Sequence, residues 1–113
     1  MKRISLIKLL GSVDIIPPSK FVNPEIKNIS FNSKDVSQGT LFLGLPGVKV
    51  DGGNFWREAI ENGAEAAIIS EEAATRTGLI NSKQVLVLKQ PFHYVFGKLV
   101  AEFWDNPSRK LKL

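Results

Sequence analysis

The chain has 113 residues, of which 43% are hydrophobic and 23% are charged. These values are typical of one globular domain and exclude a disordered chain. There is no cysteine, which excludes disulfides, thiolate metal sites and thiol catalysis. The net charge is +4, but several basic residues lie at the two ends: Lys2, Arg3, Lys8, Arg109, Lys110 and Lys112.

The first apolar run is too short, and too interrupted, for a signal peptide or a membrane span. Lys8 breaks the run and Gly11 ends it, whereas a membrane span needs about 20 apolar residues. We therefore expect a cytoplasmic protein with no membrane partner. Solvated ends explain the basic charge better than a nucleic-acid partner does.

The first 31 residues predict a helix, an extended segment and a strand. Apolar positions within residues 3–10 fit a short helix that ends at Gly11. Pro17 and Pro18 then require extended backbone. Residues 26–31 alternate in the manner of a strand.

Three strand–helix pairs are predicted next. Short apolar runs bounded by Gly or Pro predict strands at residues 41–45, 64–69 and 84–88. Helices are predicted at residues 55–61 with Asn54 as N-cap, at 71–77 ending at Gly78, and at 92–104 after Pro91. The last helix carries one apolar stripe of seven residues: Phe92, Val95, Phe96, Leu99, Val100, Phe103 and Trp104.

This order predicts an α/β fold. It implies right-handed crossovers and a mostly parallel sheet of about four to five strands, including residues 26–31, with flanking helices. We expect one domain over residues 1–113, with a lead-in helix and extended segment at 1–25 and an α/β core at 26–113.

The residues predict no complete catalytic centre and no metal site. The single histidine, His93, falls in the first turn of the last predicted helix and is interpreted as a surface residue. The sequence contains neither a GxxxxGK[ST] nor a GxGxxG motif. Carboxylates on helix surfaces or at helix ends are interpreted as solvating charges: Glu58, Glu61, Glu65, Glu71 and Glu72.

A glycine-rich loop is the best candidate for ligand binding. Residues 44–53 follow a predicted strand and lead into a helix, which is where open α/β sheets bind ligands. Glycines and free helix N–H groups suit a phosphate, although these glycines also suit simple turns. Ser33 follows the neighbouring strand and is expected at the same crevice, with Lys34 and Lys49 as sources of charge.

One set of motif residues lies within residues 26–70: Asn32-Ser33-Lys34, Gly39, Leu41-Phe42, Gly47, Asp51-Gly52, Phe55, Ala59, Gly63-Ala64 and Ala66. Their order closely resembles the N-terminal domain of Mur ligases, the ATP-dependent enzymes that add amino acids to bacterial cell-wall precursors.

The tail adds to this resemblance. Residues 103–113, which include Pro107-Ser108, resemble the segment before the ATP phosphate loop in the branch of the family that adds the third stem-peptide amino acid. We therefore expect a domain of a longer ligase.

The resemblance implies a binding role. In the family, this domain binds the UDP moiety of UDP-N-acetylmuramoyl-L-Ala-D-Glu, and other domains supply ATP, Mg²⁺ and amide formation. The chain alone is therefore expected to hold no cofactor and to be inactive. Carried over by position, Ser33 contacts the UDP. The other positions carried over are Phe31, Val48, Lys49 and Val50. Asn32 and Lys34 replace the family's Asp and Arg, and Lys lacks the bidentate fork of Arg.

Two alternatives remain open. The central pattern is shared with the family branch that adds D-Ala-D-Ala, although Pro107-Ser108 favours the first branch. A stand-alone basic module, for example for RNA, is supported only by the basic ends, without the interleaved aromatic residues of an RNA-binding sheet. The third amino acid, diaminopimelate or lysine, is also left open.

Overall fold

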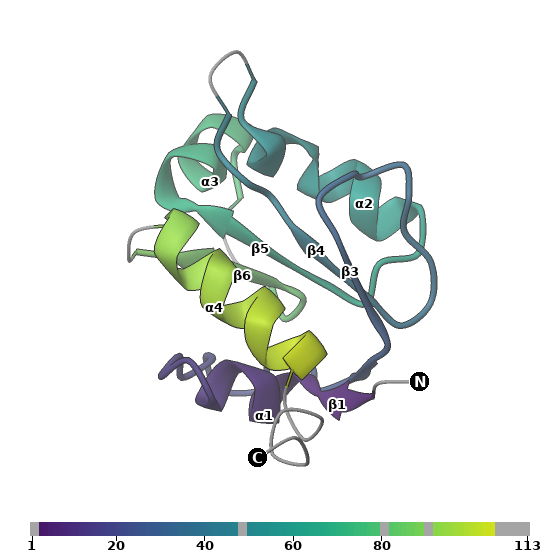
Figure 1. The fold of residues 1–113 in the computed structure, drawn as a ribbon. Coiled ribbons are helices and arrows are strands. Elements are labelled where there is room, and N and C mark those ends of the chain that lie inside the picture. Colours follow the sequence, from purple (N-terminus) through teal and green to yellow (C-terminus); the bar gives the residue numbers. More distant parts are fainter. Residues whose placement is uncertain (1–2, 48–49, 80–81, 90–91, 106–113) are drawn as a thin grey trace.

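The computed structural model describes residues 3–47, 50–79, 82–89 and 92–105, which form three layers (Figure 1). The central layer is a four-stranded sheet in the order β3-β4-β5-β6, and every neighbouring pair is parallel. Its strands are β3 (Asn28–Ser30), β4 (Thr40–Leu43), β5 (Ala66–Ser70) and β6 (Val85–Leu88). The predicted parallel α/β sheet is confirmed.

Side chains alternate between two apolar faces of this sheet. The faces are covered by helices α1 (Leu6–Gly11) and α4 (Phe92–Asp105) on one side, and by α2 (Trp56–Glu61) and α3 (Glu71–Thr77) on the other. Leu41 and Leu43 of β4 belong to the core with α1 and α4, whereas Phe42 belongs to the core with α2 and α3. Both faces are buried, as expected for a parallel sheet.

The apolar stripe predicted for the last helix lies against the sheet. In Figure 1, α4 crosses the near face of the sheet, and it also packs against α1. Its buried residues are Phe92, Val95, Phe96, Leu99 and Phe103. Trp104 was predicted within the stripe but is 51% exposed. None of the described helices is long and apolar enough to cross a membrane.

The N-terminal helix is shorter than predicted. Ile4–Ser5 form strand β1, and α1 begins only at Leu6, where the Ser5 hydroxyl accepts the N–H of Lys8 at 3.3 Å. The helix ends at Gly11, as predicted, and left-handed backbone first occurs three residues later at Asp14, with φ of 63°.

The strand predicted at residues 26–31 is broken in two. Strand β2 (Glu25–Ile26) pairs antiparallel with β1, while β3 pairs with β4. The break occurs because the N–H groups of Lys27 and Asn28 both donate to the carbonyl of Gly39, at 2.8 and 3.2 Å. The backbone therefore changes partner between Ile26 and Asn28.

Candidate ligand-binding crevice

Two open crevices lie along the edge where the parallel strands end. The first, here the serine crevice, has a volume of about 460 Å³ and is lined by Phe31, Asn32, Ser33, Lys34, Phe42, Leu45, Val50, Gly52, Phe55 and Glu58. The second, here the edge crevice, has about 850 Å³ and is lined by Pro46, Gly47, Val50, Asp51, Asn54, Ser70, Glu71, Glu72, Arg76, Leu88, Lys89 and Phe92. Val50 lines both crevices.

Helix α2 holds Ser33 by two hydrogen bonds. The Ser33 hydroxyl donates to Oε1 of Glu58 at 2.5 Å, and Nδ2 of Asn62 donates to the carbonyl of Ser33 at 3.0 Å. Ser33 is buried although it lines the crevice. The interpretation of Glu58 as a solvating charge was wrong, because its carboxylate accepts a hydrogen bond from the candidate ligand-binding serine.

The side chain of Asn32 stabilises the turn that carries Ser33. Its Oδ1 accepts the N–H of Lys34 at 2.9 Å, and its carbonyl accepts the N–H of Asp35 at 3.0 Å. The hydroxyl of Ser30 accepts the N–H of Asn32 at 3.0 Å. Asp carries the same acceptor oxygen as Asn, so replacement of the family's Asp by Asn32 preserves this turn.

Three large apolar side chains on the serine crevice are about half exposed. Phe31 is 48% exposed, Val50 is 54% exposed and Phe55 is 42% exposed. Phe31 follows β3, Val50 lies before the 3₁₀ helix η1 (Gly52–Phe55), and Phe55 ends that helix. An apolar wall beside a few polar groups is typical of a small-molecule site.

Three glycine N–H groups of the glycine-rich loop form hydrogen bonds within the loop. The N–H of Gly47 donates to the carbonyl of Val50 at 3.1 Å, and the N–H of Gly52 donates to the carbonyl of Leu45 at 2.9 Å. The N–H of Gly53 donates to Oδ1 of Asp51 at 2.8 Å. These three N–H groups therefore serve the turn, which agrees with the alternative interpretation of the glycines as turn residues, and the phosphate site stays a prediction.

Asp51, and not the predicted Asn54, caps the helical segment. Asp51 is the N-cap of η1, and α2 then begins without a side-chain cap. Asn54 instead accepts a hydrogen bond from Nη1 of Arg76 at 2.8 Å.

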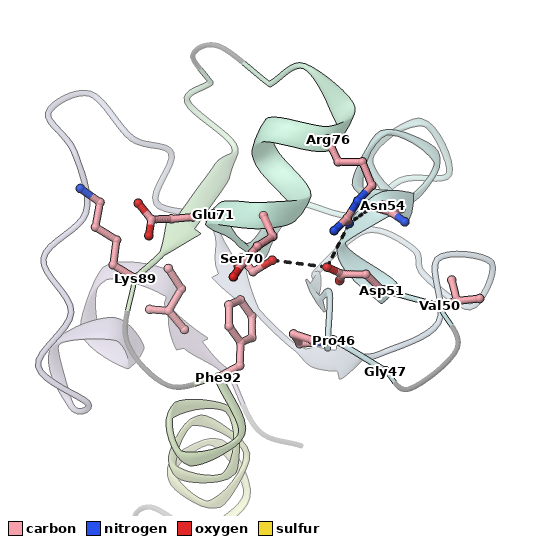
Figure 2. A pocket seen from close by; sticks show the side chains of 12 residues that line it. Pro46, Gly47, Val50, Asp51, Asn54, Ser70, Glu71, Arg76, Lys89 and Phe92 are labelled. Atoms are coloured by element: carbon pink, nitrogen blue, oxygen red, sulfur yellow. Dashed lines mark hydrogen bonds and ion pairs between the residues drawn. The ribbon is translucent and has the colours of Figure 1, made fainter.

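Asp51 also connects this loop to α3 across the edge crevice. Its Oδ2 accepts the hydroxyl of Ser70 at 3.4 Å and pairs with Nη1 of Arg76 at 3.3 Å. Figure 2 shows the Asp51 carboxylate between Ser70 and Arg76, with Glu71 and Lys89 farther along the crevice. The edge crevice therefore carries charges of both signs, and two of them, Asp51 and Arg76, pair with each other.

The structure brings together three of the five predicted contact positions. Ser33, Phe31 and Val50 line the serine crevice, whereas Val48 and Lys49 lie outside the described residues. Glu58 was missed, and no local pattern indicates it, because 25 positions separate it from Ser33. Asp51 was missed as a cap although Asp directly before a helical turn is a known signal.

The other carboxylates and the histidine differ in their surroundings. Glu65 is no mere solvating charge, because its Oε2 accepts the N–H of Gly39 at 3.0 Å. His93, Glu61, Glu71 and Glu72 are exposed. Within the described residues, no group of three or more His, Asp or Glu side chains is placed to hold a metal ion.

Comparisons with known proteins agree on one family. The model of the "Mur ligase family, catalytic domain" matches residues 25–104. The UDP-N-acetylmuramoyl-L-alanyl-D-glutamate--2,6-diaminopimelate ligase of Prochlorococcus marinus subsp. pastoris (strain CCMP1986 / NIES-2087 / MED4) is 55% identical over 113 residues, which is 100% of this chain and 22% of that protein. The ligase of the same name from Parasynechococcus marenigrum (strain WH8102) is 41% identical over 109 residues, 96% of this chain and 22% of that protein.

A solved structure shows a similar fold. The UDP-N-acetylmuramoylalanyl-D-glutamyl-2,6-diaminopimelate--D-alanyl-D-alanyl ligase from Acinetobacter baumannii matches with a TM-score of 0.62 and 26% identity, over 89% of this chain and 21% of that chain. The chain thus spans about a fifth of the length of the curated relatives that it matches.

Proposed function

Because this chain belongs to the Mur ligase family, we propose that its serine crevice binds the uridine diphosphate part of a UDP-N-acetylmuramoyl dipeptide. One observation carries the proposal: Phe31 and Ser33, which follow one strand, line a crevice at the carboxyl edge of the sheet together with Val50, which follows the next strand. This edge is where open α/β sheets bind nucleotides.

The proposed enzyme is an ATP-dependent, amide-forming ligase of peptidoglycan precursor synthesis that adds the third amino acid. The two relatives described above are both diaminopimelate ligases by name, so diaminopimelate is the proposed addition. The D-alanyl-D-alanyl ligase is a weaker candidate, because it shares the fold at only 26% identity. The chemistry is proposed to take place in regions outside this chain.

We propose that ATP and Mg²⁺ bind in parts of the enzyme outside this chain. Its sequence has no phosphate-loop motif, and its described residues include no metal-binding cluster. Its proposed contribution is to bind and orient the nucleotide handle of the substrate, which places the distant reacting carboxylate. We therefore expect no ATP-dependent ligation by the 113-residue chain alone.

Calorimetric titration of this chain with UDP tests the proposal. We expect binding by the wild type and a loss of about tenfold or more in affinity for Ser33→Ala, since a buried ligand hydrogen bond is removed. Ser19→Ala is the matched control, because Ser19 is exposed and lies outside the crevice. Failure of the wild type to bind UDP at millimolar concentration would overturn the proposal, as would unchanged affinity of Ser33→Ala.

A further inference from the structure

The hydrogen bond between Ser33 and Glu58 determines what Ser33 can offer a ligand. A serine hydroxyl has one hydrogen and two lone pairs, whereas a carboxylate can only accept. At an Oγ–Oε1 distance of 2.5 Å, the hydroxyl donates its hydrogen to Glu58. What remains available on Ser33 is a lone pair, so the serine faces a ligand as an acceptor.

The position of Glu58 is set by the backbone of its helix. Glu58 and Asn62 are four positions apart and therefore lie on one face at the end of α2. Asn62 donates to the carbonyl of Ser33 at 3.0 Å, while Glu58 accepts the hydroxyl of the same residue. Because α2 binds both the carbonyl and the hydroxyl of Ser33, the direction of the hydroxyl is fixed before a ligand binds.

The charge and the walls of the crevice indicate which part of a nucleotide lies next to Ser33. The carboxylate of Glu58 lines the crevice itself and disfavours a phosphate at this place. The half-exposed side chains of Phe31, Val50 and Phe55 offer surface for a flat ring. Lys34 lines the crevice and is exposed, so its cation is available to a diphosphate.

We propose that Glu58 is a positioning residue that makes Ser33 an obligate acceptor and thereby selects uracil over cytosine. The proposal rests on the proposed function. Uracil presents the imide N3–H, a donor, between two carbonyl groups, whereas cytosine presents a bare N3, an acceptor, at the same place. An acceptor that faces the fixed lone pair of Ser33 leaves both groups unsatisfied, which is costly because Ser33 is buried.

The test is calorimetric titration of each variant with UDP and with CDP. We expect the wild type to bind UDP about tenfold or more tightly than CDP. In Glu58→Gln this ratio is expected to fall about tenfold, because the amide can donate to Ser33 and so allow its hydroxyl to donate to cytosine. Glu61→Gln, an exposed position on the same helix, is expected to keep the wild-type ratio.

The ratio of the UDP and CDP affinities of one variant separates a change in selectivity from a loss of stability, because a loss of stability weakens the binding of both nucleotides equally. Should Glu58→Gln fail to give a folded circular-dichroism spectrum, Ser33→Ala takes its place, and its ratio is expected to approach one. An unchanged ratio in these variants, or equal affinity of the wild type for both nucleotides, overturns the role of Glu58 and leaves UDP binding standing. A wild type that binds neither nucleotide overturns both proposals.

Discussion

Removal of the Asp51 side chain is expected to destabilise the chain by about 1–2 kcal/mol. The Asp51 carboxylate caps η1 through the N–H of Gly53 at 2.8 Å, and loss of such a cap costs about 1 kcal/mol. It also pairs with Arg76, whose side chain is 51% exposed, so that ion pair adds at most about 0.5–1 kcal/mol. Asp51→Asn keeps an oxygen for Gly53 and is expected to lose only the smaller part.

Urea denaturation followed by circular dichroism measures both variants against the wild type. Asp35→Ala is the matched control, because Asp35 is exposed, and its free energy of unfolding is expected to stay within about 0.5 kcal/mol of the wild type. The reasoning fails if Asp51→Ala is as stable as the control. It also fails if Asp51→Asn loses as much as Asp51→Ala, since the loss would then come from the charge and not from the cap.

Four further substitutions test the packing and the turn by the same denaturation. In Gly44→Ala the added Cβ would lie 2.5 Å from Cα of Gly53, so we expect a loss of about 1–3 kcal/mol; wild-type stability would contradict that close approach. Gly97→Ala is the converse case, because nothing lies within 4 Å of its Cβ position in α4, and we expect a gain of about 0.5–1 kcal/mol. Leu99→Ala removes a side chain that is 0% exposed and is expected to cost about 2–5 kcal/mol; a smaller loss would mean that the site collapses around the cavity. Asn32→Asp is expected to change stability by less than about 0.5 kcal/mol, and a larger loss would show that the turn needs the amide.

The elements with long or strongly punctuated patterns could be predicted from the sequence, and the shortest ones could not. Helix α4 has seven apolar positions in one stripe, and six of them face the interior. Strands β1 and β2 have only two residues each, which is too few to show a period. The break between β2 and β3 depends on the carbonyl of Gly39, a partner that a local pattern does not contain.

Some features of the candidate site could likewise be predicted from the sequence, and others could not. Ser33 and Val50 meet because β3 and β4 are parallel neighbours, so that the loops after both strands emerge at one edge. This could be predicted from the order of the elements. The sequence could not show whether Asp51 or Asn54 caps the helical segment, because both are good N-cap residues. It was decided by the 3₁₀ turn that precedes α2.

The residue that departs from the family motif, Asn32, is not the residue that controls the motif serine. That residue is Glu58, which lies on another element. Asn32 differs from the family's Asp, yet its Oδ1 only has to accept the N–H of Lys34, and either residue does so. Ser33 matches the motif, yet the direction of its hydroxyl is set by Glu58 on another element. A change at position 32 is therefore expected to leave ligand preference intact, whereas a change at position 58 alters it while the motif itself stays the same.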